Sequence, residues 1–310
     1  MIRVRIPATS ANLGPGFDCM GMALGLWNTF ELHAQTDVPG VRVESHGEGA
    51  AGLPTDHTNM IAQTMLAELA RLEELRGQIN SAQMPRSFRI ICHNDIPCAS
   101  GMGSSSTAVL AGLIFAHGLV FGCVDIKTVL DRATALEGHG DNVAPALYGG
   151  LILISYDGEI VVAERVTLPP LRVVVCVPTF NFLTSEARAA LPRVLSRADA
   201  VFNIGRAMLV AEALRNGDDD LLARAMGDRI HEPYRIPLIP GAAHARQAAL
   251  SHGAIAVSLS GAGPGLLAYA RERHEAIGQA MQDAFHHAGL SARYWVLDAS
   301  PQGAEISIEM

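Results

Sequence analysis

The chain has 310 residues, more than the range of about 250 to 300 that one hydrophobic core usually fills, so we expect two packed domains or one large α/β unit. Hydrophobic residues make up 49% of the sequence and charged residues 17%, a composition that excludes disorder. The formal charge of -8 and the lack of basic tracts argue against a nucleic-acid partner.

The cysteines and the first residues predict a cytoplasmic protein. The opening residues alternate as in a strand and contain no apolar segment typical of a secretory signal. The cysteines form no CxxC pair and no His/Cys metal spacing, so we expect them to be reduced; they are Cys19, Cys92, Cys98, Cys123 and Cys176.

The first half of the chain mixes strands with long helices. Helical periodicity predicts a helix over residues 60–76, behind the candidate caps Asp56 and Thr58. The apolar run 108–124 carries His117 and is shorter than the ~20 residues that cross a bilayer, which predicts a buried core helix. Another helix is predicted over 125–137. Strands are predicted at 2–6, 29–35, 41–45, 87–93, 151–156 and 160–166.

A Thr-Leu-Pro-Pro segment at 167–170 is the plausible hinge to a second half. Strands are predicted there at 172–178, 254–260, 265–270, 293–297 and 305–309. Helices are predicted at 185–195, 199–215, 219–228 and 274–287. Runs of strands interrupted by unevenly spaced helices predict an α+β fold.

A loop of glycine and serine precedes the apolar helix. Residues 97–107 read Pro-Cys-Ala-Ser-Gly-Met-Gly-Ser-Ser-Ser-Thr. A glycine turn that opens a helix offers free backbone N–H groups and the positive end of the helix dipole to an anion such as phosphate. Lys127 is the single lysine, so both a P-loop and a kinase strand lysine are absent. A nucleotide bound here would rely on backbone and hydroxyl groups and a metal ion.

Residues 7–18 leave the first strand through several turn-forming residues. Asn12 and Asp18 could together bind a cation or an ammonium group, because ligand contacts concentrate in loops at strand ends. The alternative is a glycine turn with Asx caps and no ligand.

The segment 137–142, Glu-Gly-His-Gly-Asp-Asn, ends a predicted helix. Glu137 could ligate Mg²⁺ together with phosphate oxygens. His139 and Asp141 could instead indicate zinc, although no third ligand is near. A capping role for Asp141 or Asn142 is a further alternative.

Two arginines in the second half, Arg188 and Arg235, stand in polar contexts. The planar guanidinium group matches a carboxylate bidentately, although most arginines are simply surface residues. The segment 260–265, Ser-Gly-Ala-Gly-Pro-Gly, is a plain hairpin turn unless it lies beside the first glycine loop.

Together these segments resemble the GHMP kinases. The loop Pro97-x-x-x-Gly101-Met102-Gly103-Ser104-Ser105 is similar to the phosphate motif of that family, with Met102 where leucine is usual. Residues 7–18 and 260–264 resemble its first and third motifs. Residues 137–146, 231–235 and 238–241 resemble the homoserine kinase subfamily, which often has proline where this chain has Gly140. The resemblance spans nearly the whole chain.

The resemblance implies a domain similar to ribosomal protein S5 domain 2 at 1–168, a ferredoxin-like domain at 169–310 and a cleft between them. It implies a cytoplasmic, homodimeric, ATP-dependent kinase that phosphorylates L-homoserine for threonine biosynthesis. By motif position, Ser104 and Glu137 would bind Mg²⁺. ATP would contact Asn59, Pro97, Cys98, Ala99, Ser100, Gly101, Met102, Gly103, Ser104, Ser105, Ser106 and Thr107. Homoserine would contact Asn12, Asp18, His139, Asp141, Arg188 and Arg235.

The implied chemistry depends on positioning rather than on a strong base. The arginines would hold the α-carboxylate, with Arg188 assigned a catalytic role, and Asp18 would hold the α-ammonium group with Asn12. Asp141 or Asn142 would orient the hydroxyl group. Two alternatives stay open: a kinase for another small alcohol, and a nucleotide sensor that has lost turnover.

Overall fold

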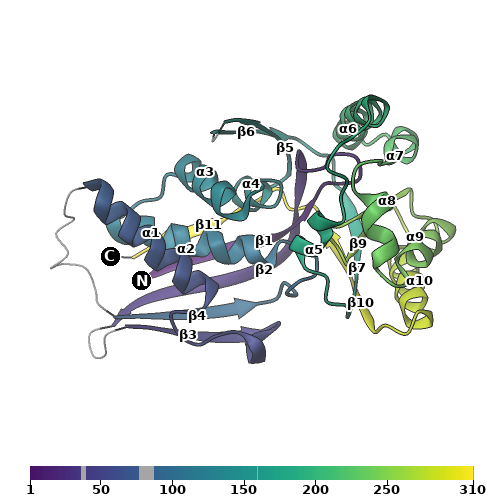
Figure 1. Ribbon diagram of the computed structural model, residues 1–310. Helices are drawn as coiled ribbons and strands as arrows, with labels where there is room; N and C mark the ends of the chain where they lie inside the picture. The colour runs from purple at the N-terminus through teal and green to yellow at the C-terminus, as the bar shows by residue number, and fades with distance from the viewer. Residues whose placement is uncertain (36–39, 77–86, 159, 310) are drawn as a thin grey trace.

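The computed structural model describes residues 1–35, 40–76, 87–158 and 160–309, which form two sheets with their helices (Figure 1). The first sheet has the order β11-β1-β2-β4-β3 and continues from β2 through β5 to β6. Its pairs are antiparallel except β3 with β4. The strands are β1 (Ile2–Ala11), β2 (Met20–Gln35), β3 (Gly40–Gly47), β4 (Ser87–Asn94), β5 (Leu151–Asp157), β6 (Ile160–Val166) and β11 (Glu305–Ile308).

Four helices lie on one side of this sheet (Figure 1), and a short 3-10 helix, η1 (Ala50–Gly52), follows β3. They are α1 (Met60–Arg76), α2 (Ser104–Phe121), α3 (Ile126–Glu137) and α4 (Val143–Tyr148). The left-handed glycines Gly103 and Gly122 bound α2, so it covers a slightly earlier span than 108–124. Its length and apolar composition would suffice to cross a membrane, but 67% of it is buried inside the protein. The predicted core helix is confirmed.

The second sheet has the order β10-β7-β9-β8 and is antiparallel throughout. Val174 and Cys176 of β7 pack under α9 and α10, whereas Val173 and Val175 face α6 and α7. Successive strand residues point to opposite faces, so β7 needs apolar residues at every position. The strands are β7 (Arg172–Pro178), β8 (Ala256–Leu259), β9 (Leu266–Tyr269) and β10 (Ala292–Asp298). The helices are α6 (Arg197–Asn216), α7 (Asp219–Ala225), α9 (Ala242–Ser251) and α10 (His274–His287).

The α+β class is confirmed, with differences in several elements. Strands β1 and β2 extend beyond the predicted 2–6 and 29–35, because residues 7–11 pair antiparallel with residues 21–27 although their small and turn-forming side chains show no strand alternation. The helix α5 (Thr184–Ala189) ends before Pro192 instead of continuing to residue 195, because proline disrupts a helix interior. The elements α4, α8 (Glu232–Arg235), η3 (Ile236–Leu238) and α9 were not predicted. All are too short or too rich in alanine to show a clear apolar period.

The end of the chain returns to its beginning. Strand β11 pairs with β1, with Ile308 opposite Ile2, so the last strand lies in the first sheet although it falls within the predicted second domain, 169–310. The edge of β1 needs a backbone partner, and no local pattern indicates that it lies some 300 residues away. The domain boundary at 168 stays a prediction.

The two sheets share one apolar cluster. Leu13, Met22 and Met102 from the first half pack in it with Val175 and Leu267 of the second sheet. Above this cluster, the backbone of Gly101 lies against the turn at 260–263, and the Ser260 hydroxyl donates to the Gly101 carbonyl oxygen at 2.8 Å. The halves are therefore joined by close backbone packing as well as by apolar burial.

A buried carboxylate joins the helices of the first half. Glu68 of α1 is 2% exposed and is held by His117 of α2, by Arg71 of its own helix and by Arg132 of α3. Burial would raise the pKa of Glu68, but the hydrogen bonds of Arg71 and His117 and the charge of Arg132 outweigh it and lower that pKa to about 2. The ionised form is therefore the stable one in the folded protein.

The substitution Gly101→Ala should destabilise the protein by about 3 kcal/mol. The φ of Gly101 is +79°, and an added Cβ would lie 2.1 Å from the Ser260 carbonyl oxygen, which is backbone and cannot rotate away. Urea unfolding measures the effect. Gly205→Ala in α6 is the matched control, because its Cβ would meet open space; equal stability of both variants would contradict the prediction.

The substitution Glu68→Gln should destabilise the protein near neutral pH and flatten its acid sensitivity. The pKa of Glu68 is lowered from 4.5 to about 2, so its contribution is present above pH 4.5 and is lost as the pH falls toward 2. The shift corresponds to about 3 kcal/mol. Urea midpoints between pH 7 and 2 test this, with exposed Glu73→Gln on the same helix as the control. Parallel wild-type and Glu68→Gln curves would rule the contribution out.

Candidate functional site

Three loops meet where the two sheets join. The Thr9 N–H donates to the Met102 carbonyl oxygen at 3.1 Å, which fixes the end of β1 to the loop 97–103. The Gly265 N–H donates to the Ser100 carbonyl oxygen at 3.2 Å from the other side. The turn 260–265 therefore lies beside the first glycine loop. This is the position in which we expected it to be more than a plain hairpin turn.

The loop 97–103 ends at the free N-terminus of α2. Ala99, Gly101 and Gly103 have φ values of 51°, 79° and 72°. The Ser100 hydroxyl donates to the Pro97 carbonyl oxygen at 2.7 Å and holds the turn. No side chain caps α2 at Gly103, so the N–H groups of its first turn remain for an anion.

Two cavities open on either side of this helix start. The polar cavity has a volume of about 360 Å³ and the neighbouring cavity one of about 390 Å³. Met60, Ala99, Ser104 and Ser105 line both. The two are thus adjacent compartments with the helix N-terminus between them.

The polar cavity brings together the side chains that the sequence singled out as ligand groups. They come from the loop after β1, the segment after α3, α5 and α8, and the cavity also reaches the turn at 261–263. These lining residues are Asn12, Asp18, His139, Asp141, Asn142, Arg188 and Arg235. Across the described ranges, no group of three His, Cys, Asp or Glu side chains is arranged to hold a metal ion, so zinc gains no support.

Asp18 and Arg188 pair with each other across the polar cavity. The guanidinium Nη1 and Nη2 donate to Oδ2 and Oδ1 at 3.0 and 2.8 Å, and these hydrogen bonds to Asp18 raise the pKa of Arg188. Asn12 holds the turn instead of facing the cavity freely: its Oδ1 accepts the Asp18 N–H at 3.0 Å and its Nδ2 donates to the Gly261 carbonyl oxygen at 2.8 Å. Asn12 therefore positions Asp18.

Arg235 is a buried cation without a carboxylate partner in the described part of the chain. It is 2% exposed, and its Nε donates to the Ala187 carbonyl oxygen at 3.1 Å. Burial first, and then the neighbouring charge of Arg188, lower its pKa to about 10. A buried charge is costly unless it is paired, so this guanidinium favours an anion in the cavity.

The segment 139–142 is tied together within the cavity wall. Burial would lower the pKa of His139, but the hydrogen bond from its Nδ1 to Asp141 Oδ1 at 2.8 Å and the charge of Asp141 raise it overall. The Asn142 amide oxygen accepts a hydrogen bond from the Thr9 hydroxyl at 2.8 Å. Asp141 thus faces the cavity as half of a pair with His139.

Tyr156 on β5, which the sequence analysis missed, holds this segment to Asp18. Its Oη accepts the Gly140 N–H at 2.8 Å and donates to the Asp18 carbonyl oxygen at 3.2 Å. Proline at position 140 could not donate such a bond. Glycine at position 140, where the subfamily often has proline, therefore keeps an N–H group that binds Tyr156 of β5. No local sequence pattern indicates this contact.

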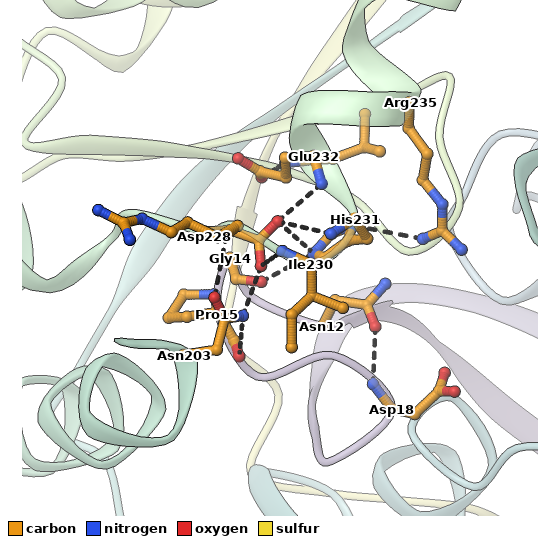
Figure 2. A network of polar contacts seen from close by, with 12 residues as sticks. Asn12, Gly14, Pro15, Asp18, Asn203, Asp228, Ile230, His231, Glu232 and Arg235 are labelled. Carbon is orange, nitrogen blue, oxygen red and sulfur yellow. Dashed lines mark hydrogen bonds and ion pairs between the residues drawn. The ribbon is translucent and has the colours of Figure 1, made fainter. Parts of the chain in front are cut away.

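Asp228 is the second group that the sequence analysis missed (Figure 2). Its buried carboxylate accepts the backbone N–H groups of residues 230–232 at 2.7–3.1 Å and the Asn203 amide at 2.6 Å. Burial would raise its pKa, but the nearby His231 imidazole and these hydrogen bonds lower it. An aspartate just before a short helix is a capping signal, and it could have been found.

His231 connects this network to the cavity (Figure 2). Its Nε2 lies 2.8 Å from the Gly14 carbonyl oxygen, so this nitrogen is the donor and Nδ1 is free to accept. Nη1 of Arg235 lies 3.3 Å from that Nδ1. The loop 12–18 and the guanidinium of Arg235 are therefore held by opposite sides of one imidazole ring.

Of the residues expected to contact a nucleotide, most line one of the two cavities and a few line neither. Cys98 and Thr107 line the neighbouring cavity, as does Asn59, although its amide is used by the Pro54 carbonyl oxygen and the Ile61 N–H at 2.9 and 3.1 Å. Ser100, Gly101 and Gly103 line the polar cavity. Pro97, Met102 and Ser106 line neither cavity.

Glu137 lies beside the first turn of α2. Its Oε2 accepts hydrogen bonds from the Ser106 and Ser105 hydroxyls at 2.7 and 3.2 Å, and Ser105 borders both cavities. One carboxylate and several hydroxyls form the hard-oxygen donor set that suits Mg²⁺ when phosphate oxygens complete it. The residues present fit such an ion.

Comparison with known proteins assigns the family. Residues 61–150 match the GHMP kinases N terminal domain and residues 210–287 the GHMP kinases C terminal model. The homoserine kinases of Moorella thermoacetica and Desulfitobacterium hafniense are 39% and 40% identical to this chain, over 98% and 99% of it and 99% and 100% of their own lengths. The crystal structure of homoserine kinase from Cytophaga hutchinsonii superimposes with a TM-score of 0.82 at 32% identity, covering 99% of this chain and 97% of that one. The chain belongs to the GHMP kinase family, and the three relatives named above, which it matches over nearly their whole length, are homoserine kinases.

Proposed function

We propose that the protein transfers the γ-phosphoryl group of ATP to the hydroxyl group of L-homoserine, giving O-phospho-L-homoserine for threonine biosynthesis. The observation that carries the substrate assignment is the charge arrangement in the polar cavity. Arg235 is buried without a carboxylate partner in the described residues, and Asp18 lies nearby in a pair with Arg188. An α-amino acid supplies the complementary charges, with its carboxylate for the arginines and its ammonium group for Asp18.

The two cavities suit the two substrates. The neighbouring cavity offers apolar walls at Phe30, Leu53 and Ile61 that fit a nucleotide base, and its border with the polar cavity is the free N-terminus of α2. Phosphates bind readily at such a terminus. The γ-phosphate would then point toward the amino acid, so the base and the acceptor occupy separate compartments.

Mg²⁺ would be held by Glu137, by the Ser104 hydroxyl and by phosphate oxygens. When bound, it would neutralise phosphate charge and orient the triphosphate. The chain's own contribution is the α2 N-terminus and the hydroxyls of Ser105 and Ser106, which already hold the Glu137 carboxylate.

The transfer itself needs alignment more than proton removal. The homoserine oxygen bonds to the γ-phosphorus as the bond to the ADP oxygen breaks, through a loose transition state, and the hydroxyl proton passes to the transferred phosphoryl group and from there to water. Asp141 and Asn142 orient the hydroxyl, and Arg188 balances the charge. Lys127, the single lysine, pairs with Asp131 on α3 at 2.5 Å and does not line either cavity, so it cannot assist a catalytic aspartate.

A cytoplasmic location and a homodimer are parts of the same proposal. The free state of all five cysteines supports a reducing compartment. The homodimer rests on the family resemblance, and sedimentation at several protein concentrations would test it.

A substrate panel should give the strongest coupled ADP release with L-homoserine. L-threonine and L-serine share its charges but hold their hydroxyl groups one carbon closer to the α-carbon, whereas mevalonate and galactose lack the ammonium group that suits Asp18. All are assayed at equal concentration with ATP and Mg²⁺. No release with homoserine, or a stronger response to mevalonate or galactose, would overturn the proposed substrate.

The substitution Asp141→Asn should leave measurable turnover, lowered by about 100-fold at most, because an amide can still orient the hydroxyl. The dependence of kcat on pH should keep its shape, since no base is removed. The matched control is Asp157→Asn, which alters an exposed carboxylate on β5. Complete loss of turnover, with ATP binding and folding intact, would show that Asp141 acts as an essential base.

A further inference from the structure

We propose that Phe17 is a positioning residue: the face of its ring holds the guanidinium groups of Arg188 and Arg235 in place. This inference rests on the proposed function. The Cζ atoms of Arg188 and Arg235 lie 5.7 and 5.2 Å from the centre of the Phe17 ring. Both distances are within the roughly 6 Å over which an aromatic ring attracts a guanidinium group. One ring therefore serves cations from two different helices, α5 and α8.

Phe17 acts from behind the cavity wall. The polar cavity is lined by its neighbour Asp18 and by both arginines, but Phe17 is not among the lining residues. Any effect of the ring on a bound amino acid must therefore pass through the guanidinium groups. This separates Phe17 from the residues that touch substrate.

The Phe17 ring packs against the His231 ring, and the backbone beside it is held by hydrogen bonds. Its centre lies 5.3 Å from that of the His231 ring, which donates to the Gly14 carbonyl oxygen three residues earlier in the same loop. On the other side, Asp18 has a φ of 55° and its N–H is held by Asn12. The loop therefore presents the ring in one orientation.

The arginines need this support because their charges repel each other. Arg188 is neutralised by Asp18, whereas the direct contacts of the Arg235 guanidinium in the described residues are two carbonyl oxygens, one imidazole nitrogen and the Phe17 ring. The quadrupole of the ring offers negative charge to both cations without an additional carboxylate. A carboxylate in that place would neutralise Arg235 and compete with the substrate, whereas an aromatic face leaves it available to an anion.

The test separates the aromatic face from simple apolar bulk. Phe17→Leu keeps an apolar side chain of similar size and should raise the KM for homoserine about tenfold, with the KM for ATP unchanged. Phe17→Tyr keeps the ring and should stay within about twofold of wild type. Phe202→Leu is the matched control. The ring of Phe202 on α6 also contacts two arginines, with the Cζ atoms of Arg206 and Arg229 at 4.9 and 4.0 Å from its centre, but it does not line the polar cavity.

An analogue of homoserine without the carboxylate tests whether Phe17 acts through the arginines that bind that carboxylate. The Ki of 3-aminopropan-1-ol as a competitor of homoserine should be the same for wild type and Phe17→Leu, because this amino alcohol offers the arginines no carboxylate. A parallel rise in this Ki, a loss in Phe17→Tyr equal to that in Phe17→Leu, or an unchanged homoserine KM in Phe17→Leu would each overturn the role of Phe17. Wild-type protein that does not phosphorylate homoserine would instead contradict the proposed function.

Discussion

The close backbone contact between the loop 97–103 and the turn 260–265 is the constraint on which the site depends. Gly101 and Ser260 approach so closely that a single methyl group would not fit between them. The Ser10 hydroxyl donates to the Ser260 hydroxyl at 2.9 Å, because the one proton of Ser260 is already donated to Gly101, and this adds the end of β1 to the same contact. Because the three loops are fixed to one another, the polar cavity can take its walls from segments far apart in the chain.

The charges in this cavity are arranged for a zwitterion. Asp18 and Arg188 satisfy each other in the protein alone, while Arg235 has no carboxylate in the described residues. An amino acid brings a carboxylate that can pair with Arg235 and an ammonium group that can pair with Asp18, whereas a neutral sugar brings neither charge. Among the described residues that line the cavity there is no lysine, and its arginines stay protonated and bind through geometry, which is consistent with transfer by alignment.

Several residues that do not line the polar cavity hold its lining residues in place. Asp228 fixes the backbone before α8, and His231 joins that helix to the Gly14 carbonyl oxygen (Figure 2). Tyr156 ties Gly140 to Asp18. These groups lie outside the polar cavity lining, yet they orient side chains that belong to it. Functional sites need such support, because a misplacement of about 1 Å is enough to impair alignment.

The amino-acid sequence by itself determined the α+β class, the long elements and the identity of the groups that line the polar cavity. Apolar runs, apolar periods and glycine turns are local properties, so α2, α10 and the loop 97–103 could be found without coordinates. Only the tertiary structure decided that β11 returns to β1, that Asn12 and Asn59 use their amides to hold turns, and that Tyr156 ties Gly140 to Asp18. These roles depend on which distant backbone groups come within about 3 Å of a side chain, and no period or spacing in the chain encodes that distance.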